Sequence, residues 1–194
     1  AVRAAGQEAE CETRLGLEVD FIPGKNEQIW ATLPALEWDF LIGSIHEVDS
    51  IYFLVQHPWS REEGEALWLR YFALLREAVV CGVFSVISHP VRMRVENAFL
   101  PATLDAELER LAAEATRCNV ALEINGYDTR RFPTLVRRLA RACALHRTPV
   151  SVGSDAHIPR QVAQAHTQTE ELLREAGIGT IRIWKRCEPQ EYTI

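Results

Sequence analysis

Two pairs of potential metal ligands stand at the ends of short apolar runs in this chain. Glu18 and Asp20 are two residues apart in the segment GLEVD, and Asp155 and His157 are two residues apart in GSDAH. Since residues i and i+2 of a strand project from the same face, the two side chains of each pair should point in one direction.

Two histidines stand in comparable places between these pairs. His46 ends the run IGSIH, and His89 follows a third apolar run in the segment SHP. Carboxylate and imidazole ligands supplied from several strand ends are what a site for more than one metal ion needs. The sequence therefore predicts a multinuclear metal site.

The elements that must position these ligands alternate along the chain. We expect strands over 15–21, 40–48, 84–89, 120–125, 149–154 and 180–184, and helices over 61–80, 104–118, 134–146 and 160–176. Ser60 and Glu63 fit a capping box at the start of the first helix, Thr103 is the expected N-cap of the second, and Gly177 closes the last. Alternation of this kind predicts a parallel sheet, either as a barrel or as a doubly wound layer.

The two faces of the strands differ in a way that favours a barrel. Leu17 and Val19 share one face of the first strand, whereas Glu18 lies on the other with glycine and aspartate. The later strands follow the same rule, and by this parity Glu123 faces inward as a supporting residue. A doubly wound sheet would make both faces apolar. Barrel enzymes carry their sites at the carboxyl ends of the strands, where these ligands stand.

Composition sets limits on the function. The chain has 194 residues, a net charge of −6 and no apolar run near the roughly 20 residues that a membrane-spanning helix needs. The acidic balance argues against general nucleic-acid binding, and no membrane partner or signal peptide is expected. The number of cysteines is odd, five, with no C-x-x-C pair, which favours a reducing, cytoplasmic location over a disulfide framework.

Five motifs together resemble the polymerase and histidinol phosphatase (PHP) family, most closely its histidinol-phosphatase branch. They are GLEVDFIPG (16–24), IGSIH (42–46), SHP (88–90), LEIN (122–125) and GSDAH (153–157). The final segment WKRCEPQEY (184–192) also resembles the last strand and tail of that branch. The resemblance covers roughly residues 14–192.

The resemblance implies a distorted, TIM-like (β/α)7 barrel that hydrolyses phosphomonoesters with two or three divalent metals, which are zinc, manganese or iron. It implies that Glu18 is a bridging carboxylate and that His46 and His89 bind one metal. Asp155 would ligate or bridge, and His157 would bind a further metal. Glu18, Asp155 and His157 are accordingly the expected catalytic residues.

Arginines are the expected phosphate ligands, because a guanidinium fork matches the geometry of phosphate oxygens. Arg130 in NGYDTRR stands where the resembled family has the arginine of its Asn-Thr-Ser-Gly-Leu-Arg pattern. Arg92 and Arg94 follow the SHP turn and are further candidates. Asp20, at a strand end, is expected either to orient a metal ligand or to bind a substrate amine.

The sequence departs from the family at its beginning. The family opens with a His-x-His strand, but no histidine precedes His46 here and no H-x-H occurs. Residues 1–12 read as the helix before the Glu18 strand, so two βα units of about 30 residues each are expected to be missing. We therefore expect residues 1–194 to form one N-terminally incomplete metallophosphoesterase domain, whose bare first strand favours self-association.

The leading functional hypothesis is a phosphatase of histidine biosynthesis that acts on a small phosphate ester, L-histidinol phosphate. One alternative is a PHP phosphoesterase for nucleotides or nucleic acids, against which the acidic charge argues. A second alternative is a non-catalytic barrel remnant, which the missing H-x-H motif favours.

Overall fold

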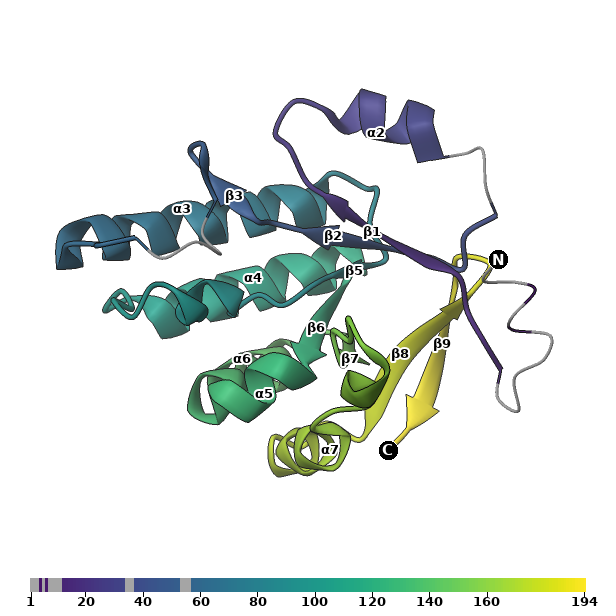
Figure 1. Ribbon diagram of the computed structural model, residues 1–194. Helices are drawn as coiled ribbons and strands as arrows, with labels where there is room; N and C mark the ends of the chain where they lie inside the picture. Colours follow the sequence, from purple (N-terminus) through teal and green to yellow (C-terminus); the bar gives the residue numbers. More distant parts are fainter. Residues whose placement is uncertain (1–3, 5, 7–11, 34–36, 53–56) are drawn as a thin grey trace.

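A curved parallel sheet forms the centre of the molecule (Figure 1). The computed structural model of the chain describes residues 4, 6, 12–33, 37–52 and 57–194, without the side chain of Trp30. The strands of this sheet, in spatial order, are β1 (Gly16–Asp20), β2 (Phe40–Ser44), β5 (Val86–Ile87), β6 (Ala121–Asn125) and β7 (Val150–Gly153). All four neighbouring pairs are parallel, which confirms the predicted α/β class and parallel sheet.

The helices in the described part of the chain are α2 (Asn26–Thr32), α3 (Arg61–Val80), α4 (Leu104–Cys118), α5 (Gly126–Arg131), α6 (Pro133–His146) and α7 (His166–Glu175), with short 3₁₀ helices η2 (Arg92–Val95) and η3 (Pro159–Gln161). Of these, α3, α4 and α6 cover one face of the sheet (Figure 1). The capping box of Ser60 and Glu63 is present at the start of α3. Thr103 does precede α4, but its side chain makes no capping hydrogen bond.

Several local elements differ from the sequence-based prediction, among them α2, where no helix was expected. The last helix begins at His166 instead of residue 160, because Ala163 and Ala165 adopt left-handed φ values of 58° and 57°. The run 40–48 is broken after Ser44, and β3 (Glu47–Val48) forms a separate hairpin with β4 (Ile51–Tyr52). The short helix α5 was not expected, and Asn125 caps it by accepting from the amides of Tyr127 and Asp128.

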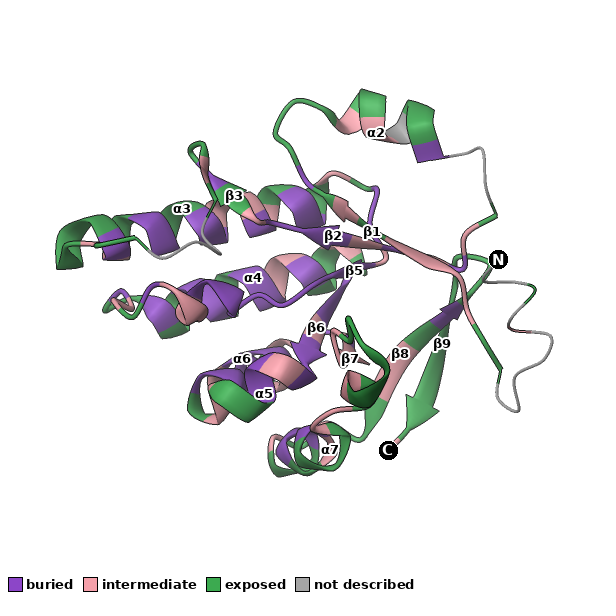
Figure 2. Ribbon diagram, viewed as in Figure 1, coloured by how far each residue is buried: buried purple, intermediate pink, exposed green. Residues whose placement is uncertain are grey.

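The apolar core lies between the sheet and α3, α4 and α6 (Figure 2). Trp68, Tyr71 and Phe72 of α3 are fully buried, and the Trp68 and Phe72 rings stack with centroids 5.6 Å apart. Leu17 and Val19 of β1 pack against the same core, as their outward parity predicts. Burial of these aromatic side chains stabilises the packing of α3 against the rest of the core.

The opposite face of the sheet borders a cavity of about 300 Å³. An antiparallel hairpin of β8 (Thr180–Lys185) and β9 (Glu188–Thr193) lies across it, and Trp184 stacks on Phe40 of β2 with ring centroids 5.9 Å apart. The amide of Cys187 also donates to the Asp39 carbonyl just before β2. The hairpin therefore joins the last part of the chain to the beginning of the sheet.

A closed seven-stranded barrel is not seen in the described ranges. β1 and β7 are the outer strands of the sheet, and β8 packs beside β7 but directs its ladder hydrogen bonds to β9. The helix expected over residues 1–12 lies almost wholly outside the described residues. No helix in the described part of the chain combines the length and apolar character needed to cross a membrane.

Candidate metal centre

Glu18, His46 and His89 come together at the carboxyl ends of three adjacent strands. Glu18 lies on β1, His46 follows β2 and His89 follows β5. Glu18 Oε1 is 3.4 Å from His89 Nε2 and 4.0 Å from His46 Nε2. One donor atom from each residue lies within 4.8 Å of the other two. Parallel strands with their carboxyl ends at one edge of the sheet produce this convergence.

The geometry and chemistry of this cluster fit a metal ion. Two ligands bound about 2.0–2.1 Å from one tetrahedral ion lie roughly 3.3 Å apart, close to the Glu18–His89 separation. His89 is buried, and its Nδ1 atom has no hydrogen-bond partner among the described residues. A carboxylate with two imidazoles is a donor set that zinc, manganese and iron all accept.

Glu18 is held in its charged form. A hydrogen bond with the His89 ring lowers the pKa of Glu18 to about 2, against the opposing effect of partial burial. The Ser44 hydroxyl donates a further hydrogen bond to Oε1 of Glu18 and lies 2.6 Å from the Ser88 hydroxyl. Glu18 is therefore a carboxylate at neutral pH and needs no deprotonation before it binds a cation.

Asp20 orients the ring of His46. Oδ1 of Asp20 lies 2.5 Å from Nδ1 of His46, which directs Nε2 toward Glu18. A carboxylate on the far nitrogen of a metal-binding histidine fixes the tautomer and the direction of the ring. Of the two roles considered for Asp20 from the sequence, the contact supports the orienting one.

Glu123 supports His89 from inside the cavity. Its Oε2 atom accepts from the His89 amide at 2.8 Å and from Asn125 Nδ2 at 3.1 Å. Burial raises the pKa of this carboxyl. Gly153 makes room for it, because a Cβ atom there would lie 2.0 Å from Glu123 Oε1. The inward direction expected from strand parity is confirmed, since Glu123 lines the cavity.

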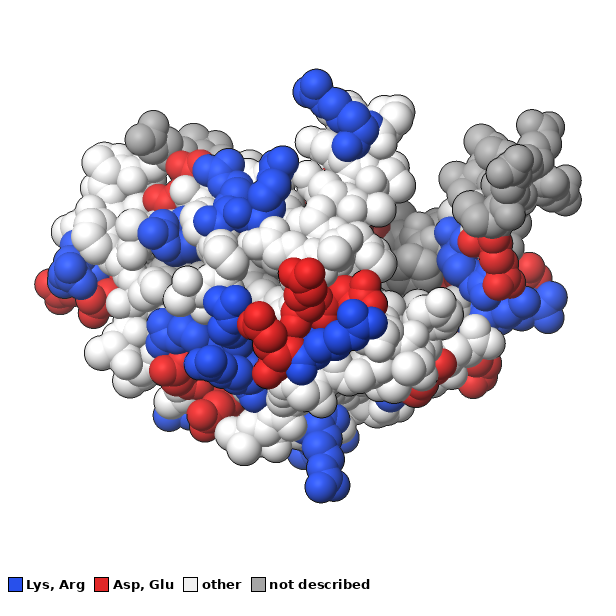
Figure 3. Space-filling view, turned by 90° about the horizontal axis from the view of Figure 1, so that it is seen from below, with Lys and Arg blue, Asp and Glu red and all other residues white. Residues whose placement is uncertain are grey.

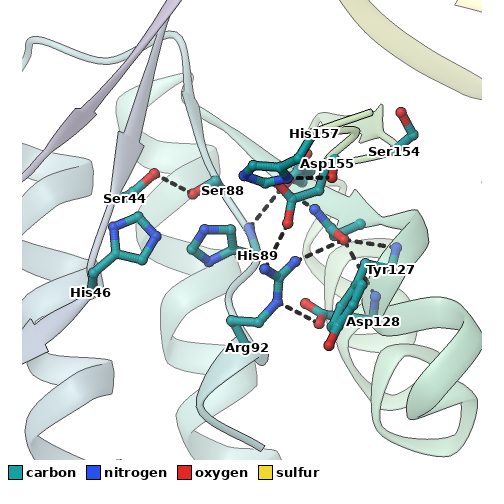
Figure 4. A network of polar contacts seen from close by, with 12 residues as sticks. Ser44, His46, Ser88, His89, Arg92, Tyr127, Asp128, Ser154, Asp155 and His157 are labelled. Atoms are coloured by element: carbon teal, nitrogen blue, oxygen red, sulfur yellow. Dashed lines mark hydrogen bonds and ion pairs between the residues drawn. The ribbon is translucent and has the colours of Figure 1, made fainter. Parts of the chain in front are cut away.

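Asp155 borders the same cavity but lies outside the three-residue cluster. Its Oδ2 atom is 2.6 Å from Nη1 of Arg92 (Figure 4). The His157 side chain is 80% exposed, and its Nδ1 atom lies 3.0 Å from the Asp155 carbonyl oxygen. The structure thus brings together three of the five expected ligands, places Asp155 nearby and leaves the His157 ring at the surface.

The three arginines expected to bind phosphate lie in different surroundings. Arg92 is buried against Asp128, Asp155 and Asn125. Arg94 stacks over the Phe132 ring at 5.2 Å, and Arg130 is exposed on α5. None of the three is among the residues that border the cavity. Their binding of phosphate stays a prediction.

Arg14 is a cavity residue that the sequence reasoning did not identify. It borders the cavity together with Glu18, and its Nε atom donates to the Trp184 carbonyl at 3.0 Å. Strand parity could have identified Arg14, because it precedes Glu18 by four residues and an even spacing places two side chains on the same face of a strand. Arg14 also pairs with Glu12, so its charge is partly balanced.

Comparison with known proteins places these features in a family context. A probable histidinol-phosphatase of Deinococcus radiodurans is 30% identical over an alignment of 192 positions, which covers 93% of this chain and 72% of that protein. The family model described as PHP-associated matches residues 135–177. The matched residues cover most of α6, together with β7 and α7, and β7 borders the cavity.

Solved structures share the fold at low sequence identity. A histidinol phosphate phosphatase from Lactococcus lactis, crystallised with zinc, L-histidinol and phosphate, gives a TM-score of 0.77 at 15% identity over 97% of this chain and 75% of that one. A chain of an archaeal ribonuclease P bound to mature tRNA gives a TM-score of 0.54 at 14% identity, over 91% of this chain and 71% of that one. At these identities the likeness concerns the fold.

Proposed function

Because this chain belongs to the histidinol-phosphatase branch of the PHP family, we propose that it is a metal-dependent phosphatase acting on L-histidinol phosphate. The observation that carries the proposal is the convergence of Glu18, His46 and His89 at the carboxyl edge of the sheet. The L. lactis protein of the same fold was crystallised with zinc, L-histidinol and phosphate, which agrees with this substrate.

The residues of the chain have separate parts in this chemistry. Bound divalent ions lower the pKa of a coordinated water and neutralise charge on phosphoryl oxygens. Glu18 supplies a negative charge at neutral pH, because its pKa is lowered to about 2. Asp20 fixes the direction of the His46 ring, and Glu123 fixes the backbone of His89.

We propose two or three ions of zinc, manganese or iron. Glu18, His46 and His89 would hold one ion, while Asp155 and His157 would contribute to a further one. Glu18, with two carboxylate oxygens, is suited to serve both. Carboxylate and imidazole donors do not discriminate among these metals. The identity of the bound ions therefore depends on which metals are available as well as on the site.

Charge argues against the nucleotide and nucleic-acid alternative. The net charge is −6, and on the face seen in Figure 3 basic and acidic side chains are interspersed. A nucleic-acid surface usually gathers basic side chains on one face. The ribonuclease P chain resembles this chain only in fold, so the similarity does not favour nucleic-acid binding. The intact cluster of Glu18, His46 and His89 argues against a remnant without catalysis.

We further propose that residues 1–194 act as one PHP-type domain, with the curved sheet as part of a barrel-like fold. The hairpin that ties Trp184 to Phe40 supports this, since it spans the open side of the sheet. A reducing, cytoplasmic location is supported by the free thiols of the four described cysteines, Cys81, Cys118, Cys143 and Cys187. The outer position of β1 supports self-association.

The test combines metal analysis with phosphate release. Metal-free protein should release little phosphate from L-histidinol phosphate, and zinc, manganese or iron should restore the activity. Glu18→Gln keeps the side-chain shape but removes the charge, so bound metal and turnover should fall together. Metal affinity should fall by more than about 100-fold, because loss of an orienting partner alone costs about 10–100-fold. Glu188→Gln on exposed β9 is the matched control. Full metal content and full turnover in Glu18→Gln would refute the assignment.

A further inference from the structure

Arg92 is a buried cation whose guanidinium group makes three directed contacts. Nε lies 2.7 Å from Asp128 Oδ1, Nη1 lies 2.6 Å from Asp155 Oδ2, and Nη2 donates to Asn125 Oδ1 at 3.0 Å (Figure 4). The Tyr127 ring lies 4.6 Å from the guanidinium carbon. A rigid planar fork with its three nitrogens engaged in this way has a fixed orientation.

Two of these partners belong to the fixed interior of the fold. Asp128 is fully buried, and Asn125 is buried at the end of β6, where its Oδ1 atom also caps α5. Removing the cation would leave buried carboxylate charge uncompensated, which is strongly unfavourable. Asp128 and Asn125 therefore hold Arg92, and Arg92 can in turn hold a less constrained group.

Asp155 is that less constrained group. It stands in the segment after β7 and has a left-handed φ of 52°, which regular strand geometry does not impose. Only its Oδ2 atom pairs with Arg92, and its Oδ1 atom lies 3.8 Å from His157 Nδ1. A carboxylate has enough lone pairs to accept from an arginine on one oxygen and to bind a cation with the other.

We propose that Arg92 is a positioning residue that fixes Asp155 as a metal ligand, and that it is not a phosphate ligand. The inference rests on the proposed function of the site. It revises the role expected from the sequence, in which Arg92 contacts the substrate.

The same network reaches the other side of the cavity. Asn125 accepts from Arg92 with its oxygen and donates with Nδ2 to Glu123, which accepts from the His89 amide. Hydrogen bonds thus run without a break from Asp155 to the backbone of His89. Arg92 joins the segment after β7 to this network of hydrogen bonds. Its guanidinium group therefore sets the spacing between Asp155 and His89 across the cavity.

The experiment is a titration of zinc into metal-free protein, with the heat of binding measured by calorimetry. Arg92→Lys keeps the charge but loses the fork, and we expect zinc affinity to fall about 10–100-fold, as for other orienting partners. Asp155→Asn should weaken the same sites. In the Asp155→Asn background, Arg92→Lys should change zinc affinity by less than about twofold, because the two residues act as a unit. Arg117→Lys, on the exposed surface of α4, is the matched control and should leave zinc affinity unchanged.

Inorganic phosphate distinguishes positioning from substrate binding. We expect its inhibition constant in zinc-loaded Arg92→Lys to stay within about twofold of the wild-type value, with the loss seen in metal affinity. Weaker phosphate inhibition at unchanged zinc affinity would overturn the inference, and so would fully additive losses in the double variant. Wild-type protein that binds no zinc and releases no phosphate would instead refute the proposed function.

A second variant keeps the test decisive if Arg92→Lys does not fold. Asp128→Asn preserves the shape of the side chain but removes the charge that anchors Nε of Arg92. Zinc affinity should fall in the same direction by a smaller factor, with a circular dichroism spectrum like that of the wild type. Unchanged zinc affinity in folded Asp128→Asn would contradict the anchoring of Asp155 through Arg92.

Discussion

The candidate site has a buried half and an exposed half, which are built in different ways. On the buried side, His89 and Arg92 have side-chain exposures of 3% and 9%, and Arg92 contacts the buried side chains of Asp128 and Asn125. On the exposed side, Glu18 and Asp20 have exposures of 42% and 60%. The buried half is fixed by folding, because unpaired polar groups there would be costly.

The exposed half depends on fewer and more solvated contacts. His46 is directed by Asp20, and Glu18 is directed by the Ser44 hydroxyl and the His89 ring. The contact of Asp20 with His46 is exposed, so water can replace Asp20 at low cost. A bound cation would therefore add more order to β1 and β2 than to β5 and β6. Substitutions should reveal this difference as larger losses of stability on the buried side and mainly losses of metal affinity on the exposed side.

The largest contrast is expected between the two histidines. His89→Gln removes a buried ring, so it should lower the free energy of unfolding by about 1–3 kcal/mol and also abolish tight zinc binding. His46→Gln should abolish zinc binding but change the free energy of unfolding of metal-free protein by less than about 0.5 kcal/mol. Urea unfolding and zinc titration of both variants measure these effects.

Exposed His166, at the start of α7, offers the control for this comparison. His166→Gln should change neither zinc affinity nor stability. Equal losses of stability in His46→Gln and His89→Gln would remove the distinction between the two halves. A stable His89→Gln that still binds zinc would exclude His89 from the metal site.

Strand parity made much of the exposed half predictable. The i, i+2 rule placed Glu18 and Asp20 on one face, and the outward set of Leu17 and Val19 packs on the core. Helix α3 was also predictable, since Ser60 and Glu63 form a local capping box. These features depend on neighbours in sequence, which is why the sequence alone indicated them.

The buried half was less predictable because its contacts join distant segments. Arg92 meets Asp128 and Asp155, which are 36 and more residues away, and no local pattern marks such a pairing. Helix α5 was missed because a segment with Asn125 and Gly126 also reads as a turn. The β8–β9 pairing was missed because every residue of β9 is exposed and lacks apolar alternation.

A smaller effect is expected at Asp20, on the exposed side. Asp20→Asn weakens the hold on His46 Nδ1, so zinc affinity should fall about tenfold, at the lower end for an orienting partner. The free energy of unfolding should change by less than about 0.5 kcal/mol. Asp49→Asn is the control, because Asp49 is also exposed but pairs with Arg70. Loss of stability without loss of zinc affinity would contradict the orienting role.

The smallest effect is the response of Glu18 to acid. Its pKa is lowered from 4.5 to about 2 in the folded chain, so Glu18 stabilises metal-free protein above about pH 4.5. This contribution should be lost as the pH falls toward 2. Allowing for solvent screening of a partly exposed group, we expect the free energy of unfolding of Glu18→Gln at pH 6 to be about 1 kcal/mol below that of the wild type. This difference should shrink steadily as the pH falls. Urea unfolding at a series of pH values measures the difference.

The pH dependence of stability should have the opposite direction for Glu123. Urea unfolding of Glu123→Gln at a series of pH values therefore tests the contrast between the buried and exposed halves of the site. Burial raises the pKa of Glu123, so the folded chain favours its protonated form and the ionised carboxylate opposes folding at neutral pH. Glutamine resembles the protonated acid and can still accept from the His89 amide. Relative to wild type, Glu123→Gln should therefore be most favourable at neutral pH and lose that advantage as the pH falls. Parallel pH trends in Glu18→Gln and Glu123→Gln would show that the two carboxylates share one environment, against the division into a buried and an exposed half.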